Sequence, residues 1–350
     1  MEKKFYLYPS CIPVKGYARS IILDTCRDKY TLIPNALYSI IEEFQGCTTS
    51  QVVHEFGVEN YSIINEYFDF MRNKDMLYFT SNGICFNPQN EVYEVSSLIS
   101  NAHIEIGLQI PYKIIDELSN LNCIVINIKF IESFSIGYVV DVLKYINQSR
   151  ISSVHITIPY SRELEEGIDS LLQTSVKIRR LVFINSPRNN EKAFGYDKRY
   201  YMFFLNKEAS DNIQCGCIHP NFFTTSKGMV IEGQTKNTCF NKKIYINKDG
   251  LLKNCPYSQQ ILGDINKECI VDVVSKENYK FLCSITKDQV NVCKDCEFRY
   301  ICMDCRVYIK DKNNIYSQPA KCNYNPYIAK WKGQDGYIPV EDWLNDNNKK

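Results

Sequence analysis

The feature that most constrains this chain is a group of cysteines in its C-terminal third. Their positions are Cys239, Cys255, Cys293, Cys296, Cys302, Cys305 and Cys322. The four from Cys293 to Cys305 have the spacing C-x2-C-x5-C-x2-C. Two C-x2-C pairs that lie close together can turn four sulfurs toward a common point, because each short loop keeps its thiolates a few ångströms apart. The pattern therefore predicts a metal centre.

The two upstream cysteines flank a predicted β-hairpin. The polar turn at residues 247–250, which ends in Gly250, lies between the apolar runs 244–246 and 251–252. Two apolar runs joined by such a turn indicate an antiparallel hairpin. Cys239 precedes its first strand and Cys255 follows its second, so we expect the hairpin to bring these thiols together.

Three interpretations compete for the cysteines. A disulfide framework requires an oxidising compartment, but the chain starts Met-Glu-Lys-Lys-Phe with no apolar segment typical of a secretory signal, and we set disulfides aside. Structural zinc is commonly bound by two C-x2-C pairs, and spacing alone favours it. Iron–sulfur clusters also use four thiolates each.

The order of these residues resembles one family. C-x10-G-x4-C, then C-x2-C-x5-C-x2-C, then a last cysteine resembles the SPASM domain, the C-terminal extension of radical SAM peptide-modifying enzymes. The usual SPASM pattern has C-x3-C where this chain has C-x2-C, from Cys302 to Cys305. The segments Asn254-Cys255-Pro256 and 293–302 resemble those of the SPASM peptide maturases in "grasp-with-spasm" gene systems, which accompany an ATP-grasp ligase.

The resemblance implies two auxiliary [4Fe-4S] clusters and assigns their ligands. One cluster takes Cys293, Cys296, Cys302 and Cys322. The other takes Cys239, Cys255 and Cys305, with Cys215 as the candidate for the fourth ligand. Cys217 is the next candidate and Cys283 a weaker one. For all three, a buried thiol without a metal is the alternative, and for Cys283 it is the better interpretation.

Composition limits the class of partner. With 350 residues the chain should form two or three domains, and 45% hydrophobic residues is ordinary for a globular protein. A net charge of +1 gives no electrostatic basis for binding nucleic acid or an anionic membrane, and no apolar stretch is long enough to span one. Sixteen cysteines without a signal indicate a reducing cytoplasm, so we expect a cytoplasmic protein.

Residues 1–92 are expected to form a winged-helix domain. Residues 5–8, 20–24 and 30–33 are strand candidates, separated by Pro9, Pro13 and Gly16. Apolar residues at helical spacing predict helices from Pro34 to Gly46, at residues 51–56 and at residues 60–73. Asn82-Gly83 between the apolar runs 76–79 and 84–86 predicts a hairpin.

Winged helices often bind DNA, but the third predicted helix carries Glu66 and Asp69 and has basic residues only near its end. Binding phosphates needs several Lys or Arg, so we expect no nucleic-acid partner. The strand-before-helix order, with residues 13–16 and Arg19-Ser20, resembles the PqqD-like recognition element of peptide-maturation enzymes. That resemblance implies that the leader of a precursor peptide adds a strand to the small sheet.

Residues 99–214 alternate between strand and helix patterns. Apolar alternation at 104–108 and 154–158, the apolar runs 123–128 and 181–184, and a last run at 200–205 predict strands, with helices between the first four along the chain. Such βα cycles favour an α/β fold with a largely parallel sheet, here four or five strands in an open sheet or partial barrel.

In a complete SPASM enzyme this region is the radical SAM barrel, whose signature is C-x3-C-x2-C. The chain has no such triplet, so we expect a degenerate barrel without a radical SAM cluster and without S-adenosylmethionine. The earlier cysteines, including Cys123, are interpreted as buried apolar residues. The histidines at 54, 103, 155 and 219 are scattered, and no catalytic residue can be named.

Two functions follow from these observations. In the first, the chain helps to mature a ribosomally synthesised, post-translationally modified peptide: residues 1–92 bind the leader, residues 99–214 form the degenerate barrel, residues 215–335 form the loop-rich iron–sulfur domain, and residues 336–350 are a tail. Its role would be accessory or redox, beside an ATP-grasp ligase, and whether it is itself an enzyme stays open. In the second, it is a zinc-stabilised peptide- or protein-binding scaffold without redox activity.

Overall fold

The structure is a computed structural model that describes residues 2–81, 96–107, 112–194, 200–206 and 215–347. The chain forms two compact units. The first contains Met1–Tyr93, Gly216–Thr238 and Ile285–Lys350, and the second contains Glu94–Cys215 and Cys239–Ser284. The range 215–335, expected from the sequence as one cysteine-rich domain, is thus divided between them. Among the described helices, none has the length and apolar character needed to cross a membrane.

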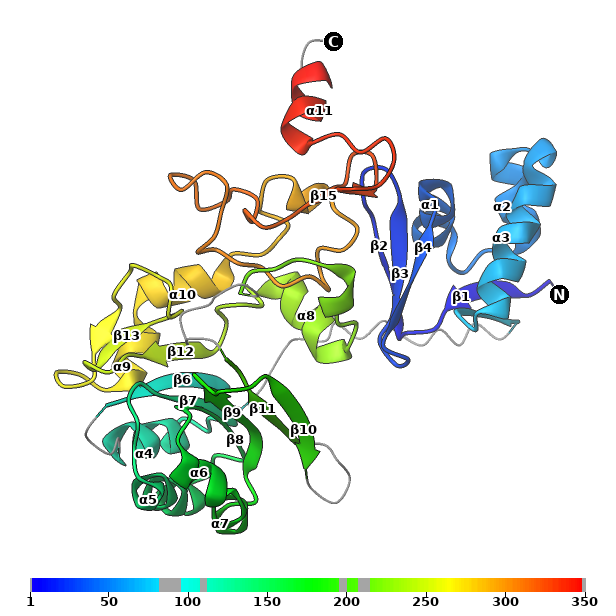
Figure 1. Ribbon diagram of the computed structural model, residues 1–350. Coiled ribbons are helices and arrows are strands. Elements are labelled where there is room, and N and C mark those ends of the chain that lie inside the picture. Colours follow the sequence, from blue (N-terminus) through cyan, green and yellow to red (C-terminus); the bar gives the residue numbers. More distant parts are fainter. Residues whose placement is uncertain (1, 82–95, 108–111, 195–199, 207–214, 348–350) are drawn as a thin grey trace. The chain divides into compact units, whose positions relative to one another are not determined.

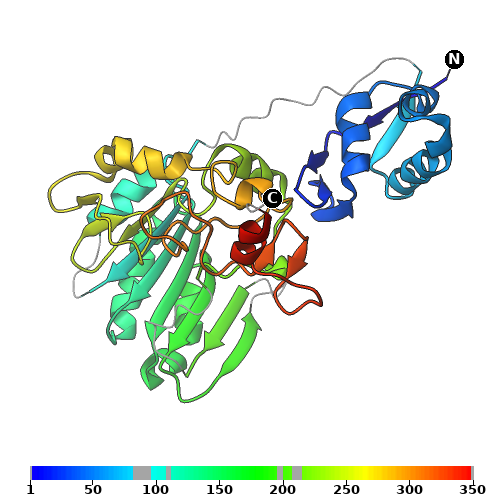
Figure 2. The same cartoon turned by 90° about the horizontal axis from the view of Figure 1, so that it is seen from above.

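The second unit is built on a sheet of nine strands, mostly parallel (Figure 1). Its parallel strands are β12 (Lys243–Ile246), β6 (Asn101–Ile106), β7 (Val125–Phe130), β8 (Ser153–Pro159), β9 (Ile178–Ile184) and β11 (Tyr200–Phe204), in this order across the sheet. Antiparallel strands complete both edges: β10 (Asn190–Phe194) beside β11, and β13 (Leu251–Lys253) and β14 (Gly263–Asp264) beyond β12. The mixed α/β class expected from the sequence is confirmed. Figure 2 shows the same sheet as a row of twisted strands, coloured from cyan through green to yellow.

Four helices lie on one face of this sheet (Figure 1): α4 (Tyr112–Asn120), α5 (Ile136–Asn147), α6 (Arg162–Glu166) and α7 (Ile168–Thr174). Neighbouring parallel strands joined by right-handed crossovers place their helices on the same side. The inward residues Ile104, Ile128 and Ile156 are buried against that layer. One helix was predicted where α6 and α7 stand; the helix breaks at Gly167, where a Cβ would lie 1.8 Å from Ile136 Cδ1.

The predicted hairpin around Gly250 is present. Strands β12 and β13 pair antiparallel, and Gly250 has a φ of +85°, which favours glycine. Asn247 Oδ1 accepts hydrogen bonds from the backbone N–H groups of Asp249 and Leu251, which holds the turn. Because β12 joins the parallel sheet beside β6, this hairpin belongs to the α/β unit. Two further helices, α9 (Ile270–Ser275) and α10 (Glu277–Ser284), follow it.

The N-terminal part of the first unit contains the predicted strands and helices. These are β1 (Lys4–Leu7), β3 (Ser20–Asp24), β4 (Lys29–Ile33), α1 (Asn35–Phe44), α2 (Thr49–Phe56), α3 (Tyr61–Asn73) and β5 (Leu77–Thr80). Phe5, Leu37, Ile41, Phe68 and Met71 are central to its core. Strand β1 pairs with β5, and the second arm of the hairpin expected after Asn82 lies outside the described residues.

A strand that the sequence analysis missed forms one edge of a three-stranded sheet. Residues read as turn punctuation around Pro13 form β2 (Cys11–Val14), which pairs antiparallel with β3, while β4 forms the other edge. Proline lacks the N–H that a central strand must donate, but an edge strand leaves one side unpaired. Pro13 is therefore compatible with β2, and the prediction of a turn there was wrong.

The C-terminal part of the first unit has little regular structure. It contains α8 (Lys227–Thr235), the short pair β15 (Tyr324–Asn325) and β16 (Lys330–Trp331), and α11 (Val340–Asn347) within the range expected as a tail. Val14, Ile21 and Leu23 of the small sheet pack in one buried cluster with Phe298 and Ile301 of the cysteine-rich loops. The small sheet and these loops therefore share a core.

Candidate metal centre

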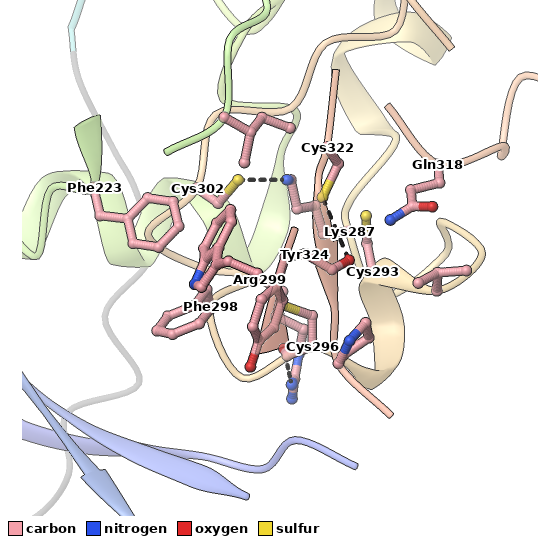
Figure 3. A pocket seen from close by; sticks show the side chains of 14 residues that line it. Phe223, Lys287, Cys293, Cys296, Phe298, Arg299, Cys302, Gln318, Cys322 and Tyr324 are labelled. Atoms are coloured by element: carbon pink, nitrogen blue, oxygen red, sulfur yellow. Dashed lines mark hydrogen bonds between the residues drawn. The ribbon is translucent and has the colours of Figure 1, made fainter. Parts of the chain in front are cut away.

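Four cysteines of the C-terminal run line one cavity. They are Cys293, Cys296, Cys302 and Cys322, the set that the family resemblance assigns to one cluster. Figure 3 shows their sulfurs around the cavity, together with the side chains of Lys287 and Gln318. Phe223, Phe298 and Trp331 add apolar walls. The structure thus brings together residues that are up to 29 positions apart (322 − 293).

The local backbone explains how the first C-x2-C pair is held. A single 3₁₀ turn, Cys293–Asp295, separates the two thiols, and the N–H of Cys296 donates to the carbonyl oxygen of Cys293 at 3.0 Å. Val292 enters this turn with a φ of +68°, a conformation that is rare for a β-branched residue. Such strain persists only where the surrounding structure enforces it.

A buried ammonium group lies among the thiols. Lys287 is 5% exposed, and its Nζ donates a hydrogen bond to Cys302 Sγ at 3.1 Å. Although burial lowers the pKa of Lys287, the charges of Cys302, Cys293 and Asp304 outweigh that effect and raise it above its usual range. The ammonium form of Lys287 and anionic sulfur in the cavity therefore stabilise each other.

Burial also acts on the pKa values of the thiols, which it raises. Burial raises the pKa of Cys293 to about 12, although Lys287 acts in the opposite direction. Burial also raises the pKa of Cys302, and that of Cys296, where the charge of Glu297 adds to the effect. Metal binding requires thiolates, so any metal bound here must displace these protons.

The second C-x2-C pair is held by a buried polar network. Asp304, between Cys302 and Cys305, forms an ion pair with Arg306 at 2.7 Å and accepts a hydrogen bond from Asn237 Nδ2 at 2.8 Å. Arg306 also donates to the carbonyl oxygens of Ile315 and Ser317. Both charged side chains are almost completely buried, so removing either one leaves the other uncompensated.

The second predicted ligand set is divided between the two units. Cys305 lies in the first unit, whereas Cys215, Cys239 and Cys255 lie in the second, so this set stays a prediction. Within the first unit, Gly216 lies against Cys305: a Cβ on this glycine would be 3.3 Å from the sulfur. Cys217 is exposed.

Two other cysteines behave as ordinary buried thiols. Cys283 Sγ donates to the carbonyl oxygen of Phe240 at 3.5 Å, and Cys123 Sγ donates to that of Val125 at 3.4 Å. Within the described ranges, no group of three or more His, Cys, Asp or Glu side chains is arranged to hold a metal ion as it stands. The four thiols around the cavity are a donor set whose chemistry suits zinc or an iron–sulfur cluster.

Sequence reasoning missed the polar residues of the cavity. Lys287 lies six positions before Cys293 and Gln318 four before Cys322, and neither position belongs to a recognisable motif. The histidines were predicted to be scattered, whereas His103 on β6 and His155 on β8 are separated by one strand, β7. The signal for the histidines was available, because both occupy polar positions in alternating strand patterns.

Fold and site together define a mixed α/β protein with a thiol-lined cavity in its cysteine-rich part. Neither a protein-family model nor a curated protein matches the sequence. The similar solved structures include SuiB of Streptococcus suis bound to S-adenosylmethionine, which is 10% identical and covers 87% of this chain and 96% of its own, with a TM-score of 0.30.

Two further SuiB structures give nearly the same values. SuiB alone is 11% identical and covers 86% of this chain and 96% of its own, and SuiB bound to the precursor peptide SuiA is 10% identical with coverages of 87% and 96%. Both have a TM-score of 0.30. A likeness at this TM-score does not establish a common fold.

Proposed function

We propose that this chain is an iron–sulfur protein that takes part in maturing a ribosomally synthesised peptide. The observation that supports the metal site is the gathering of Cys293, Cys296, Cys302 and Cys322 around one cavity that contains a buried ammonium group. This is the ligand set that the resemblance to SPASM domains assigns to a [4Fe-4S] cluster. Such a cluster supplies one-electron transfer when it is bound.

The side chains around the cavity suit that role. The four thiolates would hold the iron, and Lys287 would offset part of their negative charge inside the protein. Phe298 and Trp331 limit the access of water, which matters because solvent exposure affects both the stability and the potential of such centres. No catalytic residue is assigned, and the proposed role is accessory or redox.

The remaining parts of the proposal come from the resemblance. A second cluster would use Cys239, Cys255, Cys305 and Cys215. The leader of the precursor peptide would bind the small sheet of residues 1–92, and an ATP-grasp ligase in the same cytoplasm would act on the same peptide. The region 99–214 would serve as a degenerate radical-SAM-like barrel that does not use S-adenosylmethionine.

Metal analysis tests the proposal directly. Protein purified without oxygen should contain about four iron and four acid-labile sulfide per filled cluster, or about eight of each with both sites filled. Cys302→Ala should remove one cluster and leave the other. Cys123→Ala, which removes a thiol hydrogen-bonded to a backbone carbonyl in the other unit, is the matched control and should keep all iron.

The same experiment distinguishes the second candidate. About one or two zinc per chain with no sulfide would overturn the iron–sulfur proposal and support the zinc-stabilised scaffold. That candidate rests on the same four thiols, because a tetrahedral site of four cysteines is an ordinary zinc site. Full iron content in Cys302→Ala would contradict the ligand assignment.

A further inference from the structure

A row of polar side chains crosses the parallel sheet of the second unit. Strand pairing places six residues in register on six neighbouring strands: Tyr245, His103, Asn127, His155, Arg180 and Tyr201. Successive residues of a strand point to opposite faces. The residues next to these six along their own strands, such as Ile104 and Ile156, are buried on the face that α4–α7 cover. The row therefore lies on the face away from α4–α7.

This polarity is unusual for a parallel sheet. Parallel strands are normally covered on both faces and consist of nearly continuous apolar residues. Here the burial of β6, β7 and β8 alternates strictly, and the next row toward the carboxyl ends of β6 and β7 contains an ion pair, Lys129 with Glu105 at 3.6 Å. A face of this kind is suited to water or a polar ligand.

One imidazole in the row has a defined orientation. His155 Nδ1 lies 2.9 Å from Asn127 Oδ1. Because a carbonyl oxygen can only accept, this contact places the ring proton on Nδ1 and leaves Nε2 as a hydrogen-bond acceptor. Burial and the charge of Arg180 lower the pKa of His155. Its ring is therefore neutral at pH 7.

The charge of the row comes from Arg180. This side chain is exposed, and its guanidinium lies 4.9 Å from the centre of the Phe203 ring. Among the described residues, no carboxylate lies within ion-pairing distance of Arg180, whereas Lys129 is already paired with Glu105. The row thus presents one uncompensated positive charge beside an imidazole acceptor, which complements a ligand with a carboxylate and a neighbouring N–H donor.

The length of the row indicates the form of that ligand. Tyr245, at one end of the row, is buried; the five strands from His103 to Tyr201, about 4.8 Å apart, span roughly 19 Å, the length of about six residues of extended chain. We propose that this row binds an extended peptide segment that carries a carboxylate, which Arg180 contacts, while a backbone N–H of the peptide donates to Nε2 of His155. The class of ligand, a peptide, rests on the proposed function, whereas the residues that would contact it are identified from the sheet of the second unit alone.

The test compares two synthetic peptides of seven residues, one with a central Asp and the other with Asn in its place. Their binding to the full chain is measured by fluorescence anisotropy, with imidazole NMR signals assigned through His155→Gln. The Asp peptide should bind at least tenfold more tightly than the Asn peptide and should shift the signal of His155. Arg180→Gln should abolish this preference.

Arg179→Gln is the matched control, because it removes the same charge from the adjacent position, where Arg179 donates to the carbonyl oxygen of Val176 and the register between β9 and β8 shifts. Both variants should keep the thermal unfolding midpoint of the wild type. Equal losses in the two variants, equal affinity for the two peptides, or no saturable binding up to about 1 mM would each overturn the inference.

Iron content measured on the same samples separates this inference from the proposed function. Protein that lacks iron but prefers the Asp peptide would contradict only the metal proposal. Protein that contains the expected iron but shows no such preference would contradict only the peptide site.

Discussion

Replacing Lys287 by Met is expected to lower the reduction potential of the proposed iron–sulfur centre. Lys287 Nζ lies 3.1 Å from Cys302 Sγ inside the protein. With an effective dielectric constant of about 20, a full negative charge at that distance would be stabilised by about 5 kcal/mol. If about a quarter of the charge of an added electron reaches this one of four ligands, the loss is about 1.3 kcal/mol, or roughly 60 mV for one electron.

The assay is an anaerobic redox titration followed by EPR. Methionine has a similar length and carries no charge, so the variant fills the same space without leaving an unpaired ion. Lys294→Met is the control: it removes the same charge next to Cys293, but from an exposed side chain whose charge water screens. A shift toward higher potential, or equal shifts in the two variants, would refute the reasoning.

Three further predictions concern stability. Gly233→Ala should lower the free energy of unfolding by about 1–3 kcal/mol in urea titrations, because the new Cβ would lie 2.9 Å from the backbone oxygen of Tyr300; stabilisation, usual for this change within a helix, would contradict the packing. Arg19→Met should cost about 2–4 kcal/mol in the same assay, because it leaves the fully buried carboxylate of Glu297 without its cation, and a loss below about 0.5 kcal/mol would count against that ion pair. Burial and the charge of Arg180 lower the pKa of His155 in the folded chain, so this residue binds more protons when unfolded and its contribution to stability, present above about pH 6.5, is lost as the pH falls; His155→Gln should flatten this dependence of the melting temperature, and an unchanged slope would contradict it.

Much of the fold could be predicted because it depends on local periodicity. Alternation of apolar residues located the strands β6 and β8, a continuous apolar run located β9, and helical spacing located α1, α3 and α5. A turn was predicted at Pro13 instead of a strand. Whether a strand lies at the edge or in the centre of a sheet depends on its partner strands and not on its own residues. The close approach of Ile136 to Gly167, at the break between α6 and α7, joins residues 31 positions apart and is not recorded by any local pattern.

The cysteines of the site could be predicted from the sequence, but its buried charged residue could not. Short spacings placed Cys293, Cys296 and Cys302 in one loop region, and the family resemblance added Cys322, which lines the same cavity. Lys287 could not be found, since a buried lysine differs from a surface lysine only through its tertiary environment. The polar row of the sheet was missed for a related reason: its residues are adjacent only through strand register, which links positions tens of residues apart.

Buried contacts join the small sheet β2–β4 to the cysteine-rich loops within the first unit. The segment Val14 to Arg19, read from the sequence as part of a recognition domain, is used here for docking: Arg19 pairs with Glu297 at 2.7 Å, and Tyr324 donates to the same carboxylate. Gly16 permits the approach, because a Cβ there would lie 2.9 Å from the Cβ of Glu297 and 2.3 Å from the Arg19 backbone oxygen. Glu297 directly follows Cys296, so the turn between β2 and β3 supports the same loop that carries a proposed ligand. Folding of the small sheet and order in the thiol-lined cavity are therefore coupled through one buried carboxylate.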